Sequence, residues 1–171
     1  MSPSISDTKP SVLILGGLQD GHARALLAYL APSITDPAQQ SARHIRLVDK
    51  YLCLPQDDAY TTYMLHTFLK KSPSEKVDSE CQKVLKAGES IGVEYVQANL
   101  LVASSRSKAF TLLEQYRTES GGGGSETYDY VFEFTGEMDY NAEEGVHIER
   151  TGRLLPELGR VAAAMGVKAY V

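Results

Sequence analysis

Ser11-Val-Leu-Ile-Leu-Gly-Gly-Leu-Gln-Asp-Gly21 is the stretch of this chain that decides its fold. An apolar run from Val12 to Leu15 ends in two glycines, and a helical pattern begins within a few residues. This order is typical of a buried parallel strand that leads into the phosphate-binding turn of a nucleotide-binding α/β domain. Without a Cβ atom the backbone turns tightly and can approach a pyrophosphate, and the helix that follows offers free N–H groups to the anion. The stretch therefore predicts a strand, a glycine turn and a helix that together can hold an anion.

Strand and helix patterns alternate along the rest of the chain. Apolar stretches predict further strands over 44–50, 93–98, 128–134 and 167–171. A helix over 23–31 is rich in helix formers and ends at Pro32. A later helix is predicted from the candidate caps Ser104 and Ser105 through the apolar positions Ala109, Leu112, Leu113 and Tyr116. The last helix is predicted over 143–165, with a kink at Pro156 and an end at Gly166.

This alternation predicts a doubly wound α/β fold. Strands that alternate with helices form a parallel sheet with right-handed crossovers and helices on both faces. The expected strand order is 3-2-1-4-5, with the ligand crevice between strands one and four. Residues 11–171 form this domain, and residues 1–10 are expected to be a disordered polar tail. The segment at about 51–92 is long for a connection, and we interpret it as a helical insertion on the sheet or, alternatively, a lid over a ligand.

Composition narrows the classes of function. The 171-residue chain carries a net charge of −5, which argues against a general nucleic-acid or anionic-membrane surface. No apolar run approaches the roughly 20 residues that a transmembrane helix needs. Cys53 and Cys81 lack a metal-ligand spacing and the four histidines are dispersed, so no metal site is predicted. We expect a cytoplasmic protein with reduced cysteines.

The order of four short motifs resembles the short-chain dehydrogenase/reductase superfamily, in its extended, epimerase/dehydratase-like branch. They are the Gly-Gly turn after the first strand, Val48-Asp49, Ala98-Asn99-Leu100, and Phe134-Thr135-Gly136-Glu137. The resemblance covers the amino-terminal Rossmann half of that fold only. It implies a domain truncated after the fifth strand, as in a fragment of a longer dehydrogenase or epimerase.

The resemblance also implies a site for NAD or NADP. Gly16, Gly17 and Gly21 look like the pyrophosphate loop, and Asp49 looks like the acid that accepts hydrogen bonds from the adenosine ribose. A strand-terminating acid that caps the next turn is an equal alternative for Asp49. Asp49 favours NAD, although a basic neighbour such as Lys50 is also able to receive a 2′-phosphate.

Three further positions complete the implied cofactor site. Asn99 stands where the family usually has an Asp in contact with adenine. Thr135 and Gly136 stand where the backbone at the end of the fourth strand approaches the cofactor. The nearby carboxylates are either a pair for acid–base chemistry or a solvated acidic turn; they are Glu133, Glu137 and Asp139.

The chain departs from the family's pattern in ways that bear on binding and catalysis. The family's glycine spacing is G-x-x-G-x-x-G, and here one residue is added before Gly21, or Ala23 replaces the last glycine. Asp20 brings negative charge to the anion site, unless His22 or Arg24 offsets it. None of the ten tyrosines is followed four residues later by Lys, which is the family's proton-transfer pair. No catalytic residue is therefore assigned.

The sequence thus predicts an NAD(P)-binding Rossmann domain that is not catalytic as it stands. The alternatives, both with a degenerate cofactor site, are a non-catalytic interaction protein that has lost the cofactor and a redox-sensing regulator that binds the dinucleotide without turning it over. An apolar fifth strand at the edge of the sheet is then a candidate surface for self-association or for a partner.

Overall fold

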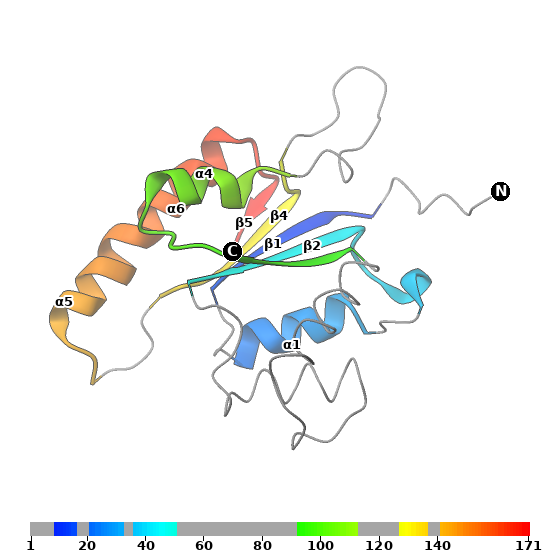
Figure 1. The fold of residues 1–171 in the computed structure, drawn as a ribbon, viewed down its shortest axis with the longest axis horizontal. Helices are drawn as coiled ribbons and strands as arrows, with labels where there is room; N and C mark the ends of the chain where they lie inside the picture. Colours follow the sequence, from blue (N-terminus) through cyan, green and yellow to red (C-terminus); the bar gives the residue numbers. More distant parts are fainter. Residues whose placement is uncertain (1–8, 17–20, 33–35, 51–91, 113–126, 137–140) are drawn as a thin grey trace.

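The chain forms a parallel β-sheet with helices on both faces. The computed structural model describes residues 9–16, 21–32, 36–50, 92–112, 127–136 and 141–171. Its strands are β1 (Ser11–Gly16), β2 (His44–Asp49), β3 (Val93–Gln97), β4 (Tyr130–Phe134) and β5 (Ala169–Tyr170). Their order is β3-β2-β1-β4-β5 and every pairing is parallel, which confirms the predicted architecture (Figure 1). The predicted insertion, apart from residue 92, lies outside the described residues.

Strand β1 lies in the middle of the sheet because both of its faces are apolar. All six residues of β1 are buried, and so are all six of β2. A strand covered by helices on both faces needs an unbroken apolar run, which Val12 to Leu15 supply. Alternate side chains point to opposite faces, so Val12 and Ile14 enter one core while Leu13 and Leu15 enter the other.

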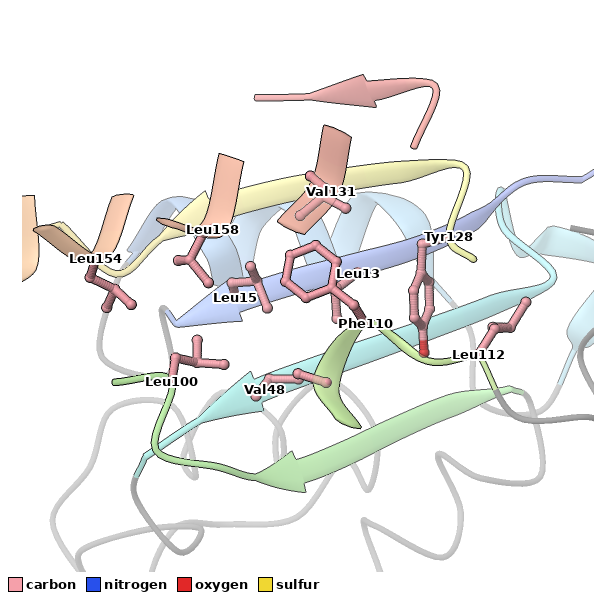
Figure 2. Close-up of a cluster of buried hydrophobic side chains, with 12 residues drawn as sticks. Leu13, Leu15, Val48, Leu100, Phe110, Leu112, Tyr128, Val131, Leu154 and Leu158 are labelled. Atoms are coloured by element: carbon pink, nitrogen blue, oxygen red, sulfur yellow. The ribbon is translucent and has the colours of Figure 1, made fainter. Parts of the chain in front are cut away.

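Helices cover the hydrophobic core on each face of the sheet. Helix α1 (Gly21–Leu30) covers one face of the sheet, and α4 (Ala103–Phe110) with α6 (Leu155–Ala164) covers the other (Figure 1). On the second face, Phe110 of α4 and Leu158 of α6 pack over Leu13 and Leu15 of β1 (Figure 2). The first core draws Ala23 and Leu27 from α1, as the helical pattern after the glycine turn predicts.

Helix α4 is shorter than predicted and lacks the predicted cap. Its N-cap is Val102, which makes no side-chain capping hydrogen bond, so the assignment of Ser104 and Ser105 as caps is wrong. The helix ends at Phe110, and Thr111 is already extended. Leu112, expected on the helix, leaves it and is fully buried in the core beside Phe110. At this end of the helix, the guanidinium of Arg46 from β2 donates hydrogen bonds to the last backbone carbonyls.

The predicted helix over 143–165 consists of three consecutive segments. They are α5 (Glu144–His147), the π-helical segment η4 (Ile148–Leu154) and α6 (Leu155–Ala164). Pro156 lies in the first turn of α6, and the backbone stays helical from η4 into α6 through Leu154 and Leu155. The chain therefore accommodates the proline by a wider π turn directly before it, within one continuous helical run.

The last strand is shorter than the predicted 167–171. Met165 caps α6, and Gly166 follows it with φ +73°, which confirms Gly166 as the residue that ends the helix. Strand β5 then covers only Ala169–Tyr170, although Val171 continues the pairing through its N–H to Val131 O at 2.9 Å. The side chain of Val171 is 68% exposed, so the outer edge of the sheet carries an open apolar residue.

Candidate functional site

The candidate site lies at the carboxyl ends of the parallel strands. Strand β1 pairs with β2 on one side and with β4 on the other, so the order of connections reverses between β1 and β4. Ligands of open α/β sheets bind at the carboxyl ends of the strands next to such a reversal. Most of the residues predicted for the site follow or end these strands in the described part of the chain.

Gly16 ends β1 and lies directly against Thr135 after β4. Its φ is +73°, and a Cβ atom at this position would lie 2.9 Å from Thr135 Cγ2 and 3.0 Å from the carbonyl of Phe134. No side chain fits in that space, and L-residues rarely adopt this φ. Packing of the two strand ends therefore requires glycine at position 16. The predicted neighbour, Gly17, lies outside the described residues.

Gly21 is the first residue of α1. The helix spans ten residues and has no acidic residue among its own first turn, so its partial positive charge is not offset from within the helix. Figure 1 shows that the amino-terminal end of α1 lies near the carboxyl end of β1. The helix that follows the glycine turn thus has the orientation that the sequence predicts.

Asp49 ends β2 and lies beside the end of β3. It is 8% exposed, its Oδ1 accepts the backbone N–H of Lys50 at 2.6 Å, and its carbonyl accepts the N–H of Ala98 at 2.7 Å. The contact with Lys50 is the one expected of an acid that terminates a strand. The alternative role, binding the ribose of a dinucleotide, stays a prediction.

Asn99 forms the turn between β3 and α4. Its Oδ1 accepts the N–H of Leu101 at 3.1 Å, and its carbonyl accepts the N–H of Val102 at 3.0 Å. The side chain is exposed at the same edge of the sheet as Asp49. Asn99 thus has a local structural role, and its predicted contact with adenine is not tested by this geometry.

Thr135 donates both of its hydrogen bonds to one carboxylate oxygen. Its N–H and its hydroxyl are bonded to Oε1 of Glu133, two residues earlier on β4. Burial raises the pKa of the Glu133 carboxyl, and the two hydrogen bonds from Thr135 oppose that rise without cancelling it. Gly136 follows, and a Cβ there would make ordinary contact with Leu155 Cδ1 at 3.8 Å. The other two carboxylates predicted near this strand end, Glu137 and Asp139, lie outside the described residues.

A buried polar cluster, which sequence reasoning missed, lies on the α4 face of the sheet. Arg46 of β2 donates from Nε to Glu94 Oε2 at 2.9 Å, and His44 Nε2 lies 3.4 Å from the same oxygen. The Tyr128 ring stacks on His44 at 5.7 Å, and the Arg46 guanidinium carbon lies 5.6 Å from its centre. The sequence does contain a signal for this cluster: His44 and Arg46 alternate with Ile45 and Leu47 in β2, which places the two polar side chains on the same face.

The guanidinium of Arg46 also ends helix α4. Its Nη1 donates to the carbonyl oxygens of Lys108, Ala109 and Thr111, at 3.1, 3.1 and 2.7 Å. These carbonyls lie in the last turn of the helix and just beyond it, and the Lys108 carbonyl also accepts the backbone N–H of Thr111 at 3.3 Å. A cation at a helix C-terminus is also favoured by the helix dipole. Arg46 therefore replaces the next turn that the sequence pattern predicted.

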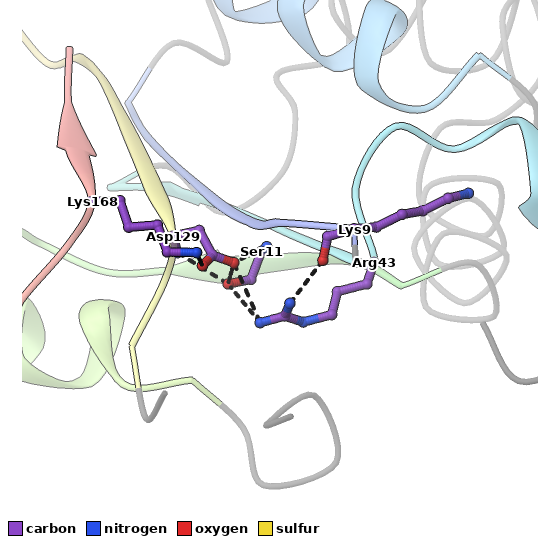
Figure 3. A network of polar contacts seen from close by, with 5 residues as sticks. All are labelled: Lys9, Ser11, Arg43, Asp129 and Lys168. Carbon is purple, nitrogen blue, oxygen red and sulfur yellow. Dashed lines mark hydrogen bonds and ion pairs between the residues drawn. The ribbon is translucent and has the colours of Figure 1, made fainter. Parts of the chain in front are cut away.

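A second polar cluster lies at the amino ends of the strands, away from the candidate site. Asp129 accepts hydrogen bonds from Ser11 N at 2.7 Å and from Ser11 Oγ at 3.0 Å (Figure 3). It also pairs with Lys168 Nζ at 2.7 Å and with Arg43 Nη2 at 3.4 Å. Arg43 in turn donates to the carbonyl of Lys9 at 2.7 Å, so the chain just before β1 is attached to the loop before β2. This cluster joins β1, β2 and β4 at their starts.

The described part of the chain offers neither a metal cluster nor a membrane-spanning helix. Across the described ranges, no three His, Cys, Asp or Glu side chains come together in a way that could hold a metal ion. Among the helices of those same ranges, none is long and apolar enough to cross a membrane.

The fold is similar to that of two solved structures. The Bordetella bronchiseptica enzyme WbmG, in complex with NAD, aligns with 99% of this chain and 38% of its own, at a TM-score of 0.52 and 12% identity. Pen from Bacillus thuringiensis aligns with 95% of this chain and 37% of its own, at a TM-score of 0.52 and 14% identity. The chain thus spans less than two fifths of each of these proteins. The likeness shows the fold, which is the predicted Rossmann-like α/β sheet. No protein-family model and no curated protein matches the chain.

Proposed function

We propose that this chain is an NAD(P)-binding Rossmann domain, similar to the cofactor half of an extended short-chain dehydrogenase, that does not itself catalyse hydride transfer. The observation that carries the proposal is the close approach of Gly16 to Thr135 at the ends of β1 and β4. The strand order reverses at this point, which is where open α/β sheets bind nucleotides, and α1 starts nearby at Gly21 with free N–H groups that can bind a pyrophosphate. The NAD bound to the structurally similar WbmG supports the same class of ligand.

NAD is the proposed cofactor rather than NADP. The buried Asp49 carboxylate at the end of β2 is an acceptor for the two ribose hydroxyls of NAD, and it repels a 2′-phosphate. Asp49 Oδ1 accepts the backbone N–H of Lys50, and a ribose hydroxyl would have to share or replace that donor. The exposed Lys50 side chain is the feature that favours NADP instead.

The absence of catalysis is proposed on the chemistry of the tyrosines. None of them precedes a lysine by four residues in the sequence, and the family uses that pair to transfer a proton. Tyr170 on β5 does not replace it, because burial and the nearby Glu133 carboxylate raise the pKa of its phenol well above the usual value. A phenol that holds its proton so firmly is a poor general acid near neutral pH.

We propose the cytoplasm as the compartment of this protein, on its composition alone.

The second candidate function is a non-catalytic interaction protein or a redox-sensing regulator. Two observations favour it: packing alone explains Gly16, and Glu133 already holds the donors of Thr135. In that case the outer edge of β5, with Tyr170 and Val171 exposed, is the surface for a second copy of this chain. Sedimentation of the wild type and of Tyr170→Lys tests this: a dimer that the lysine dissociates supports the edge contact, and a monomer in both contradicts it.

Calorimetric titration with NAD⁺, NADH, NADP⁺ and NADPH tests the main proposal. We expect NAD⁺ and NADH to bind more tightly than the phosphorylated forms. Asp49→Asn is expected to lower NAD⁺ affinity about tenfold, which corresponds to about 1.4 kcal/mol and to one lost charge-assisted hydrogen bond. The control, Glu149→Gln, removes an exposed carboxylate on η4 that is not among the residues proposed for the site, and it should bind as the wild type does. No binding at millimolar nucleotide would overturn the proposal in favour of the non-catalytic interaction protein.

A further inference from the structure

Glu133 competes with any ligand for the hydrogen-bond donors at the end of β4. Thr135 has two donors, its backbone N–H and its hydroxyl, and both are bonded to Glu133 Oε1. Thr135 is also the residue that touches the end of β1, because Gly16 has no side chain there. Among the described residues, these two donors at the reversal of strand order are therefore occupied by a group of the same chain.

The backbone of Glu133 is held by both neighbouring strands. Its residue pairs with Leu15 of β1, and its N–H donates to Val171 O beyond β5 at 2.8 Å. The side chain is half-buried on the face of the sheet that also carries Val131 and Tyr170. The backbone of Glu133 is therefore anchored by both neighbouring strands, and its carboxylate is bonded to both donors of Thr135.

We propose that Glu133 is an internal acceptor that limits dinucleotide affinity by occupying the N–H and the hydroxyl of Thr135. This inference rests on the function proposed above. A phosphate or ribose oxygen that binds Thr135 must displace the carboxylate, and the displaced group then needs new partners in a half-buried position. An ionised Glu133 also repels the pyrophosphate. The site is thus weakened by a residue that does not belong to the glycine loop.

Two substitutions separate occupation of the donors from charge. Glu133→Met keeps the bulk of the side chain and removes both the acceptor and the charge, whereas Glu133→Gln keeps an acceptor oxygen and removes only the charge. We expect Glu133→Met to raise NAD⁺ affinity about tenfold, the factor to which about 1.4 kcal/mol corresponds. Glu133→Gln should give a smaller rise, because its amide oxygen still competes for Thr135.

The measurement is titration of each full-length protein with NAD⁺, after circular dichroism and thermal unfolding have shown that it is folded. Glu149→Gln is the control for loss of one negative charge and should leave the affinity unchanged. In a Thr135→Val background, Glu133→Met should give a smaller gain, because only the backbone N–H is left to release.

The outcomes distinguish this inference from the proposed function. A wild type that does not bind, beside a Glu133→Met protein that does, would support the inference strongly. Equal NAD⁺ binding by the wild type and both Glu133 variants would overturn the inference and leave the cofactor proposal standing. No binding by any of the proteins would overturn both.

Discussion

The guanidinium of Arg46 on β2 is bonded through Nε to the carboxylate of Glu94 on β3, with Nε 2.9 Å from Oε2. The two residues are partners in the register of the parallel pair, so both side chains point to the same face of the sheet. The arginine is 4% exposed and the glutamate 20%. The ion pair is therefore largely shielded from water between the sheet and α4. Each charge is stabilised by the other, and Arg46 also by the carbonyls at the end of α4.

Replacement of Arg46 by Met is expected to destabilise the fold. The change removes the guanidinium from Glu94 and the hydrogen bonds from Arg46 to the carbonyls of Ala109 and Thr111, while the Lys108 carbonyl keeps only the Thr111 N–H. Loss of one partner of a buried ion pair costs about 3–5 kcal/mol, and partial exposure of Glu94 places the expected loss at about 2–4 kcal/mol. Urea unfolding measures it.

The matched control for that variant is Arg160→Met on α6. Arg160 pairs with Glu157 within the same helix, and both side chains are exposed. Exposed pairs contribute about 0–1 kcal/mol, so the control should unfold nearly as the wild type does. If Arg46→Met were no more destabilised than this control, the assigned role of Arg46 would be wrong. Adding Glu94→Leu to Arg46→Met should recover part of the loss, because no buried charge is then left alone.

Stability is expected to fall with acid because of His44. Burial lowers the pKa of this imidazole below 6.5; the Glu94 carboxylate opposes that shift, and Arg46 and Arg43 add to it. The folded protein then binds fewer protons than the unfolded chain, so the contribution is complete above pH 6.5 and is lost as the pH falls toward the lowered pKa.

Unfolding free energies between about pH 8 and about pH 5 measure this dependence. His44→Phe keeps a ring to stack on Tyr128 and should flatten the decline over that range. Glu94, whose pKa is also lowered, adds a second decline only below 4.5; because its hydrogen bond with His44 contributes to that lowering, His44→Phe should weaken this second decline too. An unchanged slope in His44→Phe would contradict the assignment.

Asp129 is expected to hold the starts of β1, β2 and β4 together. Burial alone would raise its pKa, but hydrogen bonds from Lys168 and Ser11 and the charge of Arg43 lower it below 3.8. Its contribution is therefore present above that pH and is lost as the pH falls through the lowered value. Asp129→Ala should cost about 2–3 kcal/mol in urea unfolding, because the buried Ser11 N–H loses its acceptor.

The comparison for Asp129 is Lys168→Met. The lysine side chain is 69% exposed, so water can replace the ion pair after its removal. Lys168→Met should therefore destabilise the protein measurably less than Asp129→Ala. The reverse order would show that the network depends on the lysine rather than on the hydrogen bonds to Ser11.

Gly16→Ala is expected to be destabilising by about 2–4 kcal/mol, because the new methyl group meets both a forbidden φ and the Thr135 side chain. Gly145→Ala on α5 is the matched change in open space, since a Cβ there meets no heavy atom within 4 Å. That helical substitution should stabilise the protein by about 0.5–1 kcal/mol. Thermal unfolding of the two variants in parallel gives the comparison. Equal midpoints would contradict the packing that we assign to Gly16.

Much of the site was predictable because it lies at strand ends. Gly16, Asp49, Asn99 and Thr135 each follow or end an apolar run, and in a parallel sheet such ends meet at one edge. What the pattern did not predict is that local partners already occupy several of them. The contact of Thr135 with Glu133 and the turn at Asn99 depend on side-chain directions at the strand ends, which periodicity does not contain.

The sequence by itself determined the topology of this protein. The run from Val12 to Leu15 can only be buried on both faces, and its alternation with helical segments leads to the order β3-β2-β1-β4-β5. Only the tertiary structure decided where α4 ends and how β2 carries a buried histidine and arginine. Those features depend on Arg46, Glu94 and Tyr128, which are far apart in the chain and meet only when the sheet and its helices are assembled. The local pattern of apolar residues predicts which side chains are buried. It does not predict which buried charges form pairs, because the partners are distant in sequence.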